Sequence, residues 1–235
     1  MNVLTCMREF KVPNLVFSSS CTVYGQADVL PVTEKTPRHE AESPYGNTKV
    51  MSEDIIRDLM RVEPDMKALA LRYFNPIGAH PTAFIGELPN GVPNNLIPYL
   101  TQTAIGIREQ LSVFGDDYNT PDGSPLRDYI DVVDLAQAHV VAIRRLLDGK
   151  NKKNYEFFNI GTGKALSVLE IIHAFERATG VKVNYKVVGR RAGDIEKVWA
   201  DTTLANNELG WKAVTPIEET LANAWKWQKS LEATN

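Results

Sequence analysis

The chain has 235 residues, of which 43% are hydrophobic and 23% charged, with a formal net charge of −3 at pH 7. This composition is typical of a globular protein, and it excludes a disordered chain and the basic balance of a nucleic-acid-binding protein. No apolar run approaches the length of a membrane span, and the start lacks the features of a signal peptide. The two cysteines and four histidines show no metal-ligand spacing. We therefore expect a cytoplasmic protein with no metal, membrane or nucleic-acid partner.

The first structural signal is an amphipathic helix over Met1–Phe10, followed by a short apolar strand, Leu15–Phe17. Hydroxyl side chains come directly after this strand, at Ser18, Ser19 and Ser20. In an open α/β sheet, ligands bind at the carboxyl ends of the strands. The hydroxyls are therefore predicted to face a ligand.

A helix is predicted from Tyr45 to about Val62, because Ser43 suits the N-cap and Pro44 the first helical position. Tyr45 and Lys49 then lie four residues apart on one helix face, where a phenol and an ammonium can form an acid/base pair. Such pairs are common on ordinary helices, so the serine-rich strand end is what favours catalysis here. The helix is expected to pack through an apolar stripe formed by Met51, Ile55, Leu59 and Val62.

The remaining pattern predicts further strands and helices of an α/β protein. Ala68–Phe74 is a second buried strand, which implies a parallel, right-handed crossover through the Tyr45 helix. The glycine turn at Gly161-Thr162-Gly163 could be mistaken for a dinucleotide loop, but Leu166 stands where the third glycine belongs. Other strands are predicted at Leu111–Gly115, Tyr155–Ile160 and Val181–Val188, and other helices over residues 96–107, 132–147, 167 onward, 202–209 and 216–230.

Together these segments resemble the UDP-glucose 4-epimerases, a family of the extended short-chain dehydrogenase/reductase type. The similarity covers nearly the whole chain, and the order of the motifs is more specific than any one of them. The matching segments are residues 18–25 (SSSCTVYG), 43–49 (SPYGNTK), 72–81 (RYFNPIGAHP), 93–96 (PNNL), 114–118 (FGDDY), 122–130 (DGSPLRDYI) and 190–194 (RRAGD).

The resemblance implies a fold and a domain organisation. The expected fold is the C-terminal part of a Rossmann-like parallel sheet plus a smaller α/β substrate-binding lobe. Residues 1–75 would be the remnant of the NAD-binding domain, with the Tyr-x-x-x-Lys helix. Residues 76–235 would mainly form the UDP-sugar lobe, with about 128–160 returning to the Rossmann-like domain. Family members also form homodimers.

The same resemblance implies an activity, the interconversion of UDP-glucose and UDP-galactose by transient oxidation of sugar C4 with NAD. Tyr45 would be the base and later the acid, and Lys49 would favour the phenolate and bond the nicotinamide ribose. Ser20 and Thr22 would hydrogen-bond the O4 oxygen, and Phe74 would meet the nicotinamide. Tyr45, Lys49, Ser20 and Phe74 are therefore the expected cofactor-binding residues. Each catalytic role suits the side chain, since hydroxyls and a phenol can donate and accept protons.

The expected substrate-binding residues also follow from the resemblance. They divide by the part of the UDP-sugar that each would contact. Ser20 would bind the sugar, and Asn75 would bind the substrate through its amide. The helix start at Asn94, Asn95 and Leu96 would meet the diphosphate, which Arg127 and Arg191 would clamp, while Phe114 would contact the uracil and Asp194 the ribose. Without the family, each arginine would be read as a surface residue.

Two features depart from the family pattern. The Gly-x-x-Gly-x-x-Gly turn that carries the NAD pyrophosphate is not in this sequence, so we hypothesise a truncated or misassigned reading frame. A truncated, non-catalytic UDP-sugar-binding remnant is therefore one alternative. Another nucleotide-sugar-modifying enzyme of the family, such as a 4,6-dehydratase, is a second, although Cys21 and Thr22 provide no acid beside Ser20. The second departure is Val198, whose small side chain predicts tolerance of N-acetylated UDP-sugars.

Overall fold

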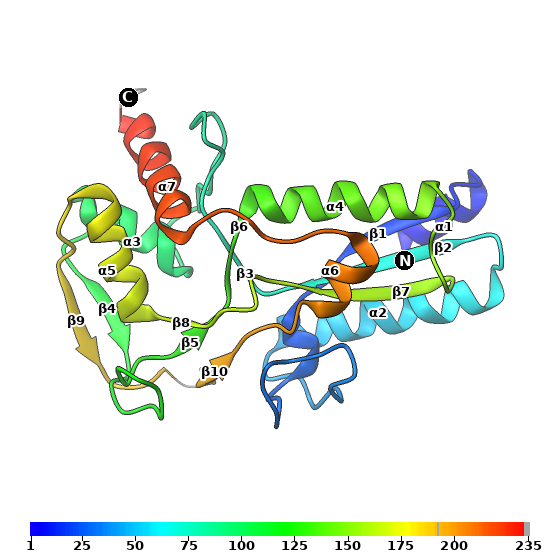
Figure 1. Cartoon of the computed structure of the whole chain (residues 1–235), viewed down its shortest axis with the longest axis horizontal. Coiled ribbons are helices and arrows are strands. Elements are labelled where there is room, and N and C mark those ends of the chain that lie inside the picture. Colours follow the sequence, from blue (N-terminus) through cyan, green and yellow to red (C-terminus); the bar gives the residue numbers. More distant parts are fainter. Residues whose placement is uncertain (192, 233–235) are drawn as a thin grey trace. The chain divides into compact units, whose positions relative to one another are not determined.

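A computed structural model describes residues 1–191 and 193–232 of the chain. The chain forms two compact units (Figure 1). Unit 1 comprises Met1–Phe74, Ala136–Gly161 and Ala200–Lys212, and unit 2 comprises Asn75–Leu135, Thr162–Trp199 and Ala213–Asn235. Each unit therefore combines segments that are far apart in the sequence. No helix in the described part of the chain is long and apolar enough to cross a membrane.

Unit 1 is built on a parallel three-stranded sheet with the order β1-β2-β7. The strands are β1 (Asn14–Ser18), β2 (Lys67–Tyr73) and β7 (Tyr155–Ile160). In the register of β2 with its neighbours, Ala70 lies opposite Phe17 and Leu71 lies opposite Phe158. The predicted parallel crossover from the first strand to the second is therefore confirmed, and β2 forms the buried centre of the sheet.

The helices of unit 1 are α1 (Asn2–Glu9), α2 (Pro44–Val62), most of α4 (Val132–Leu147) and α6 (Thr203–Leu209), with the 3-10 turn η1 (Cys21–Tyr24). Figure 1 shows α2 and α4 along opposite sides of the sheet. Side chains alternate between the faces of a strand, and consecutive residues of β2 show this arrangement. Arg72 bonds Glu53 of α2, whereas the Tyr73 ring centre lies 6.3 Å from the ring of His139 in α4.

The buried face of α2 differs from the predicted apolar stripe. Met51, Ile55 and Val62 are 50%, 41% and 71% exposed, so the stripe prediction was wrong for these residues. The buried side chains of α2 are those of Glu53, Ile56 and Met60. A buried cluster joins α1, α2 and the sheet through Leu4, Met7, Ile56, Met60, Met66 and Ala68.

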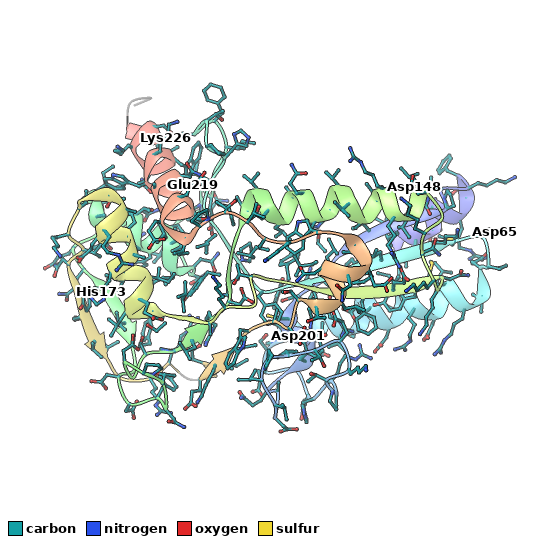
Figure 2. The ribbon with its side chains drawn as sticks, in the orientation of Figure 1. Asp65, Asp148, His173, Asp201, Glu219 and Lys226 are labelled. Carbon is teal, nitrogen blue, oxygen red and sulfur yellow. The ribbon has the colours of Figure 1, made fainter. Side chains whose placement is uncertain are left out.

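The two ends of the unit 1 sheet have different surroundings (Figure 2). Asp65 precedes β2 and Asp148 follows α4, and both lie at the end where the strands β2 and β7 begin. Asp201 lies toward the opposite end, and its N–H donates to the carbonyl of Val32 at 2.7 Å. The loops that follow the carboxyl ends of the strands therefore gather on the Asp201 side, where a ligand site is expected.

The described residues of unit 2 form three small sheets and three packed helices. Two of the sheets have two strands each, β3 (Asn75–Ile77) with β6 (Tyr129–Asp131) and β4 (Leu111–Phe114) with β9 (Tyr185–Val188). The other sheet has three strands in the order β10 (Lys197–Val198), β5 (Leu126–Arg127) and β8 (Leu166–Ser167). The helices are α3 (Leu96–Ala104), α5 (Val168–Thr179) and α7 (Ile217–Glu232). Residues of β4 and of these three helices form one core, including the fully buried Leu100, Val113, Ile171, Phe175 and Leu221.

Candidate functional site

The first candidate site lies at the carboxyl end of β1 in unit 1. The chain leaves the strand through Ser19 and Ser20, which are 0% and 6% exposed, and enters η1. Ser20 is the N-cap of η1, and its hydroxyl oxygen accepts a hydrogen bond from the N–H of Thr22 at 3.3 Å. Two of the predicted catalytic hydroxyls therefore belong to one tight turn.

The start of α2 packs directly against this turn. Ser43 caps the helix as predicted, because its hydroxyl accepts from the N–H of Gly46 at 3.1 Å. A Cβ at Gly46 would lie 3.2 Å from the carbonyl oxygen and 3.4 Å from the Cβ of Thr22. The position therefore leaves little room for a side chain. This close approach brings Tyr45, whose residue is 53% exposed, to the same end of the sheet as Ser20.

Lys49 connects the helix to the strand end. Its Nζ donates to the carbonyl of Ser18 at 2.8 Å and lies 5.4 Å from the centre of the Tyr45 ring. An ammonium has three donors, so further donors are available after the Ser18 bond. The structure thus places the four predicted catalytic residues, Ser20, Thr22, Tyr45 and Lys49, on two adjoining elements of unit 1.

Two groups beside Lys49 were not found from the sequence. Ser18 Oγ and His139 Nε2 are 2.8 Å apart, so one hydrogen-bonds the other. Burial and, after it, the proximity of Tyr45 raise the pKa of Tyr73, against an opposing hydrogen bond with Ser18. The only sequence signal was that Ser18 directly follows the predicted strand Leu15–Phe17 and that Tyr73 is the last residue but one of the predicted strand Ala68–Phe74.

Another feature that the sequence did not reveal is a buried ion pair next to Tyr24 of η1. Arg72 forms a two-point ion pair with Glu53, with Nε to Oε1 at 2.9 Å and Nη2 to Oε2 at 2.5 Å. The Glu53 and Arg72 side chains are 2% and 5% exposed. Burial raises the pKa of Tyr24 to about 12, which keeps its hydroxyl protonated as the donor to Asn159 Oδ1 at 2.7 Å.

The Lys49 ammonium, which has further donors, fits a hydroxyl group of a bound cofactor, and the Thr22 hydroxyl fits an oxygen of a bound substrate. The Thr22 oxygen is buried and makes no hydrogen bond within the described residues. Phe74, predicted to meet a nicotinamide, follows β2 beside β1 and is 4% exposed, so most of its ring is packed in the protein. The arrangement combines an exposed phenol, an ammonium with spare donors and an unsatisfied hydroxyl, which suits reversible proton transfer to a polar ligand.

Unit 2 holds a separate cavity of about 310 Å³ at the start of α3. Its lining combines aromatic and apolar residues with amides and one arginine, a mixture typical of small-ligand sites. An adjoining cavity of about 250 Å³ shares several of these residues. The predicted substrate residues in the first are Asn94, Asn95, Leu96, Phe114, Arg191 and Asp194; Asn75 and Arg127 line the second.

The start of α3 leaves backbone donors available to this cavity. Asn95 is the N-cap, but its side chain makes no capping bond; its Nδ2 donates to Glu87 Oε1 at 2.7 Å. The first N–H groups of a helix have no partner within the helix, and the helix dipole favours an anion there. The position of this helix start in both cavities therefore suits a phosphate group.

Two charged residues that line the cavities, Arg127 and Asp194, are paired with each other. Arg127 forms an ion pair with Asp194, and its Nη1 also donates to the carbonyl of Leu126 at 2.8 Å. Val198 is 8% exposed and lies opposite Arg127 in the pairing of β10 with β5. Tyr99, Ser112, Pro125 and Val168 also line the first cavity, and sequence reasoning missed them. Tyr99 could have been found from its place on the Leu96 helix, one turn after the predicted phosphate contacts.

Comparisons with known proteins give consistent results. A family model described as GDP-mannose 4,6 dehydratase matches residues 1–224. The chain is 49% identical to a UDP-glucose 4-epimerase of Mus musculus over 97% of this chain and 65% of the mouse protein. It is 50% identical to a UDP-glucose 4-epimerase of Bacillus subtilis over 95% of this chain and 65% of that protein. The chain thus spans just under two thirds of the length of these relatives.

Solved structures show the same similarity. A UDP-glucose 4-epimerase of Stenotrophomonas maltophila, with bound NAD and formylated UDP-arabinopyranose, matches with a TM-score of 0.94 and 46% identity, over 99% of this chain and 68% of that one. The enzyme of Bifidobacterium longum, in complex with NAD+ and UDP, matches with a TM-score of 0.90 and 44% identity over 97% and 67%. The UDP-Glc/GlcNAc 4-epimerase of Campylobacter jejuni matches with a TM-score of 0.79 and 33% identity, over 97% and 68%. The chain belongs to the UDP-glucose 4-epimerase family of extended short-chain dehydrogenase/reductases.

Proposed function

We propose that this protein interconverts UDP-glucose and UDP-galactose by transient oxidation at sugar C4, with NAD as cofactor. The observation that carries the proposal is the arrangement at the end of β1. There the exposed phenol of Tyr45 lies beside the Lys49 ammonium, and the first turn of α2 packs on the turn that carries Ser20 and Thr22. Relatives with bound NAD together with a UDP-sugar or UDP support the choice of ligands.

Proton transfer at O4 is assigned to Tyr45. As a phenolate it accepts the O4 proton, and as a phenol it returns that proton to the same oxygen. Lys49 favours the phenolate by its charge and has donors to spare for the nicotinamide ribose. The hydroxyls of Ser20 and Thr22 can donate to the C4 ketone and accept from the C4 alcohol. Bound NAD would supply the group that takes the hydride from C4 and gives it back.

The nucleotide part of the substrate is assigned to the cavity of unit 2. The amides at the start of α3 and the guanidinium groups of Arg127 and Arg191 suit a diphosphate. Phe114 offers a ring face for the uracil, Asp194 an acceptor for ribose hydroxyls, and Asn75 an amide for the sugar. The small side chain of Val198, opposite Arg127 in the pairing of β10 with β5, is proposed to allow an N-acetyl group at sugar C2, and the family includes a Campylobacter enzyme named for UDP-Glc and GlcNAc.

A homodimer is proposed on the exposed face of α2. Met51, Ile55 and Val62 are apolar and at least 41% exposed, and they recur on one side of the helix. Burying such a stripe against a second copy would remove apolar surface from water. This proposal agrees with the homodimers expected from the family resemblance.

A second candidate function is binding of UDP-sugars without turnover. One observation favours it: the cavity that suits the nucleotide is lined by residues of unit 2 alone. Binding of UDP would then require no residue of the Tyr45 site. The dehydratase alternative is less favoured, because Cys21 and Thr22 beside Ser20 carry no carboxyl group.

One experiment separates these candidates. The purified protein is titrated with NAD and with UDP-glucose, and its conversion of UDP-galactose is then measured for the wild type and for Tyr45→Phe. We expect turnover in the wild type and a loss of about 10²–10⁴-fold in the variant, as for removal of a general acid/base. UDP-glucose binding should be unchanged. Binding of UDP-glucose without turnover by the wild type would support the second candidate.

A further inference from the structure

The buried ion pair of Glu53 and Arg72 has contacts that reach well beyond the pair. Glu53 Oε1 also accepts a hydrogen bond from the Ser19 hydroxyl at 2.5 Å, and Ser19 is fully buried. One carboxylate therefore joins three elements: α2, the central strand β2 and the end of β1. Replacing a buried pair of this kind with apolar residues is often neutral for stability, so stability alone gives a weak reason for these charges.

The guanidinium of Arg72 lies against two aromatic rings. Its central carbon is 4.8 Å from the centre of the Tyr24 ring and 3.9 Å from that of Phe157. Tyr24 is the last residue of η1, and Ser19 stands just before Ser20, its N-cap. The ion pair is therefore in contact with both ends of the short turn that carries Ser20 and Thr22.

The same ion pair is aligned with the proposed acid/base residues. Tyr45, Lys49 and Glu53 follow one another at four-residue intervals along α2, which places them on one face of the helix. A shift of Glu53 along or around the helix axis would move Tyr45 with it. The contacts to Ser19 and Tyr24 would meanwhile hold the hydroxyl turn in place.

We propose that Glu53, Arg72 and Ser19 are positioning residues that fix the Ser20–Thr22 turn relative to the Tyr45 helix. The expected effect on catalysis rests on the proposed function, whereas the expected effect on the position of the Ser20–Thr22 turn does not depend on turnover. Misplacement of a reacting group by about 1 Å can cost about 10²-fold in rate. The Ser19 hydroxyl is the group of the three that can be removed with the least disturbance, because the ion pair between Glu53 and Arg72 remains intact without it.

The test compares Ser19→Ala and Glu53→Gln with a matched control, Glu156→Gln. Glu156 forms a similar two-point ion pair with Arg145, with side chains 9% and 7% exposed, and it bonds no residue of the hydroxyl turn. Hydrogen exchange of the backbone amides of residues 20–24 is measured in the wild type and in each variant of the 235-residue chain, together with kcat and KM for UDP-galactose and with Tm. Exchange reports on positioning without any turnover.

In Ser19→Ala we expect exchange of the 20–24 segment to accelerate at least tenfold, consistent with losing a hydrogen bond to a charged group. The kcat should fall at least tenfold while KM stays within twofold. Glu53→Gln should show the same pattern more strongly, and Glu156→Gln should show neither change. The proposal would be overturned if the 20–24 segment of Ser19→Ala exchanged at the wild-type rate, or if Glu156→Gln accelerated this exchange as much as Ser19→Ala does. Faster exchange in Ser19→Ala with an unchanged kcat would also overturn it. If the wild type turns over no substrate, the proposed function fails, and the exchange data alone decide the positioning role.

Discussion

Nucleotide recognition can be tested with two neighbouring arginines of unit 2. Arg191 lines the 310 Å³ cavity, whereas Arg190 does not. Arg190 Nε lies 2.6 Å from Asp117 Oδ1, and its guanidinium stacks 4.0 Å from the centre of the Tyr118 ring. Replacing either with methionine removes one positive charge from nearly the same place. Only the loss of Arg191 should remove a contact with the diphosphate.

The size of the effect follows from the exposure of Arg191. A hydrogen bond to a charged group contributes about 1.5–3 kcal/mol, and an exposed arginine belongs at the lower end because solvent and salt screen it. Since about 1.4 kcal/mol corresponds to a factor of ten in Kd, Arg191→Met should weaken UDP binding about tenfold. Arg190→Met changes only a neutralised charge outside the cavity, so its effect should stay below about twofold.

Isothermal titration of UDP into the wild type and both variants measures this difference. Repeating the titration at higher ionic strength should narrow the gap between Arg191→Met and the wild type, because screening weakens the exposed contact. Equal weakening in the two variants would indicate a general attraction between the anion and a basic loop. That result, or unaltered binding in Arg191→Met, would refute the assignment of Arg191 to the diphosphate.

Three further changes give separate tests. Burial raises the pKa of Glu34 more than the hydrogen bond from the N–H of Asn159 lowers it. The folded state is therefore most stable below the ordinary carboxyl pKa and loses stability as the pH rises through the raised pKa of Glu34. Glu34→Gln should raise Tm at pH 7 but not in acid, and a lower Tm at pH 7 would contradict this. Ile55→Lys on the exposed face of α2 should leave Tm nearly unchanged and shift the protein toward monomer in sedimentation velocity, whereas an unaltered dimer would exclude this face. Val198→Tyr should abolish turnover of UDP-GlcNAc while retaining that of UDP-galactose; equal activity of both forms on UDP-GlcNAc would remove the proposed role of this valine.

The sequence predicted elements whose signals are local. The Ser43 cap depends on residues three positions apart, and the parallel pairing of β1 with β2 follows from the order strand, helix, strand along the chain. The predicted ends of helices and strands were less accurate where an element gives way to irregular backbone. The predicted strand Val181–Val188 is shortened to Tyr185–Val188, and the Leu96 helix ends at Ala104 instead of near Ile107.

The buried face of α2 could not be predicted because its key residue is charged. Hydrophobic periodicity selected Met51 and Ile55, which face solvent, while Glu53 is buried through its ion pair with Arg72, 19 positions along the chain. Nothing within the helix marks Glu53 as buried. The link between Ser18 and His139 spans 121 positions and is equally invisible in the sequence, since it requires the fold to bring α4 against β1.

The most direct measurement of the central claim follows the hydrogen at sugar C4. UDP-galactose carrying deuterium at C4 is incubated with the protein and NAD in ordinary water, and the product UDP-glucose is analysed by mass spectrometry and NMR. If C4 is oxidised and then reduced within one bound complex, the deuterium stays at C4 of the product, and Tyr45→Phe forms almost no product. Replacement of the deuterium by solvent hydrogen would contradict the proposed C4 oxidation, and absence of any UDP-glucose would contradict epimerase activity of this chain.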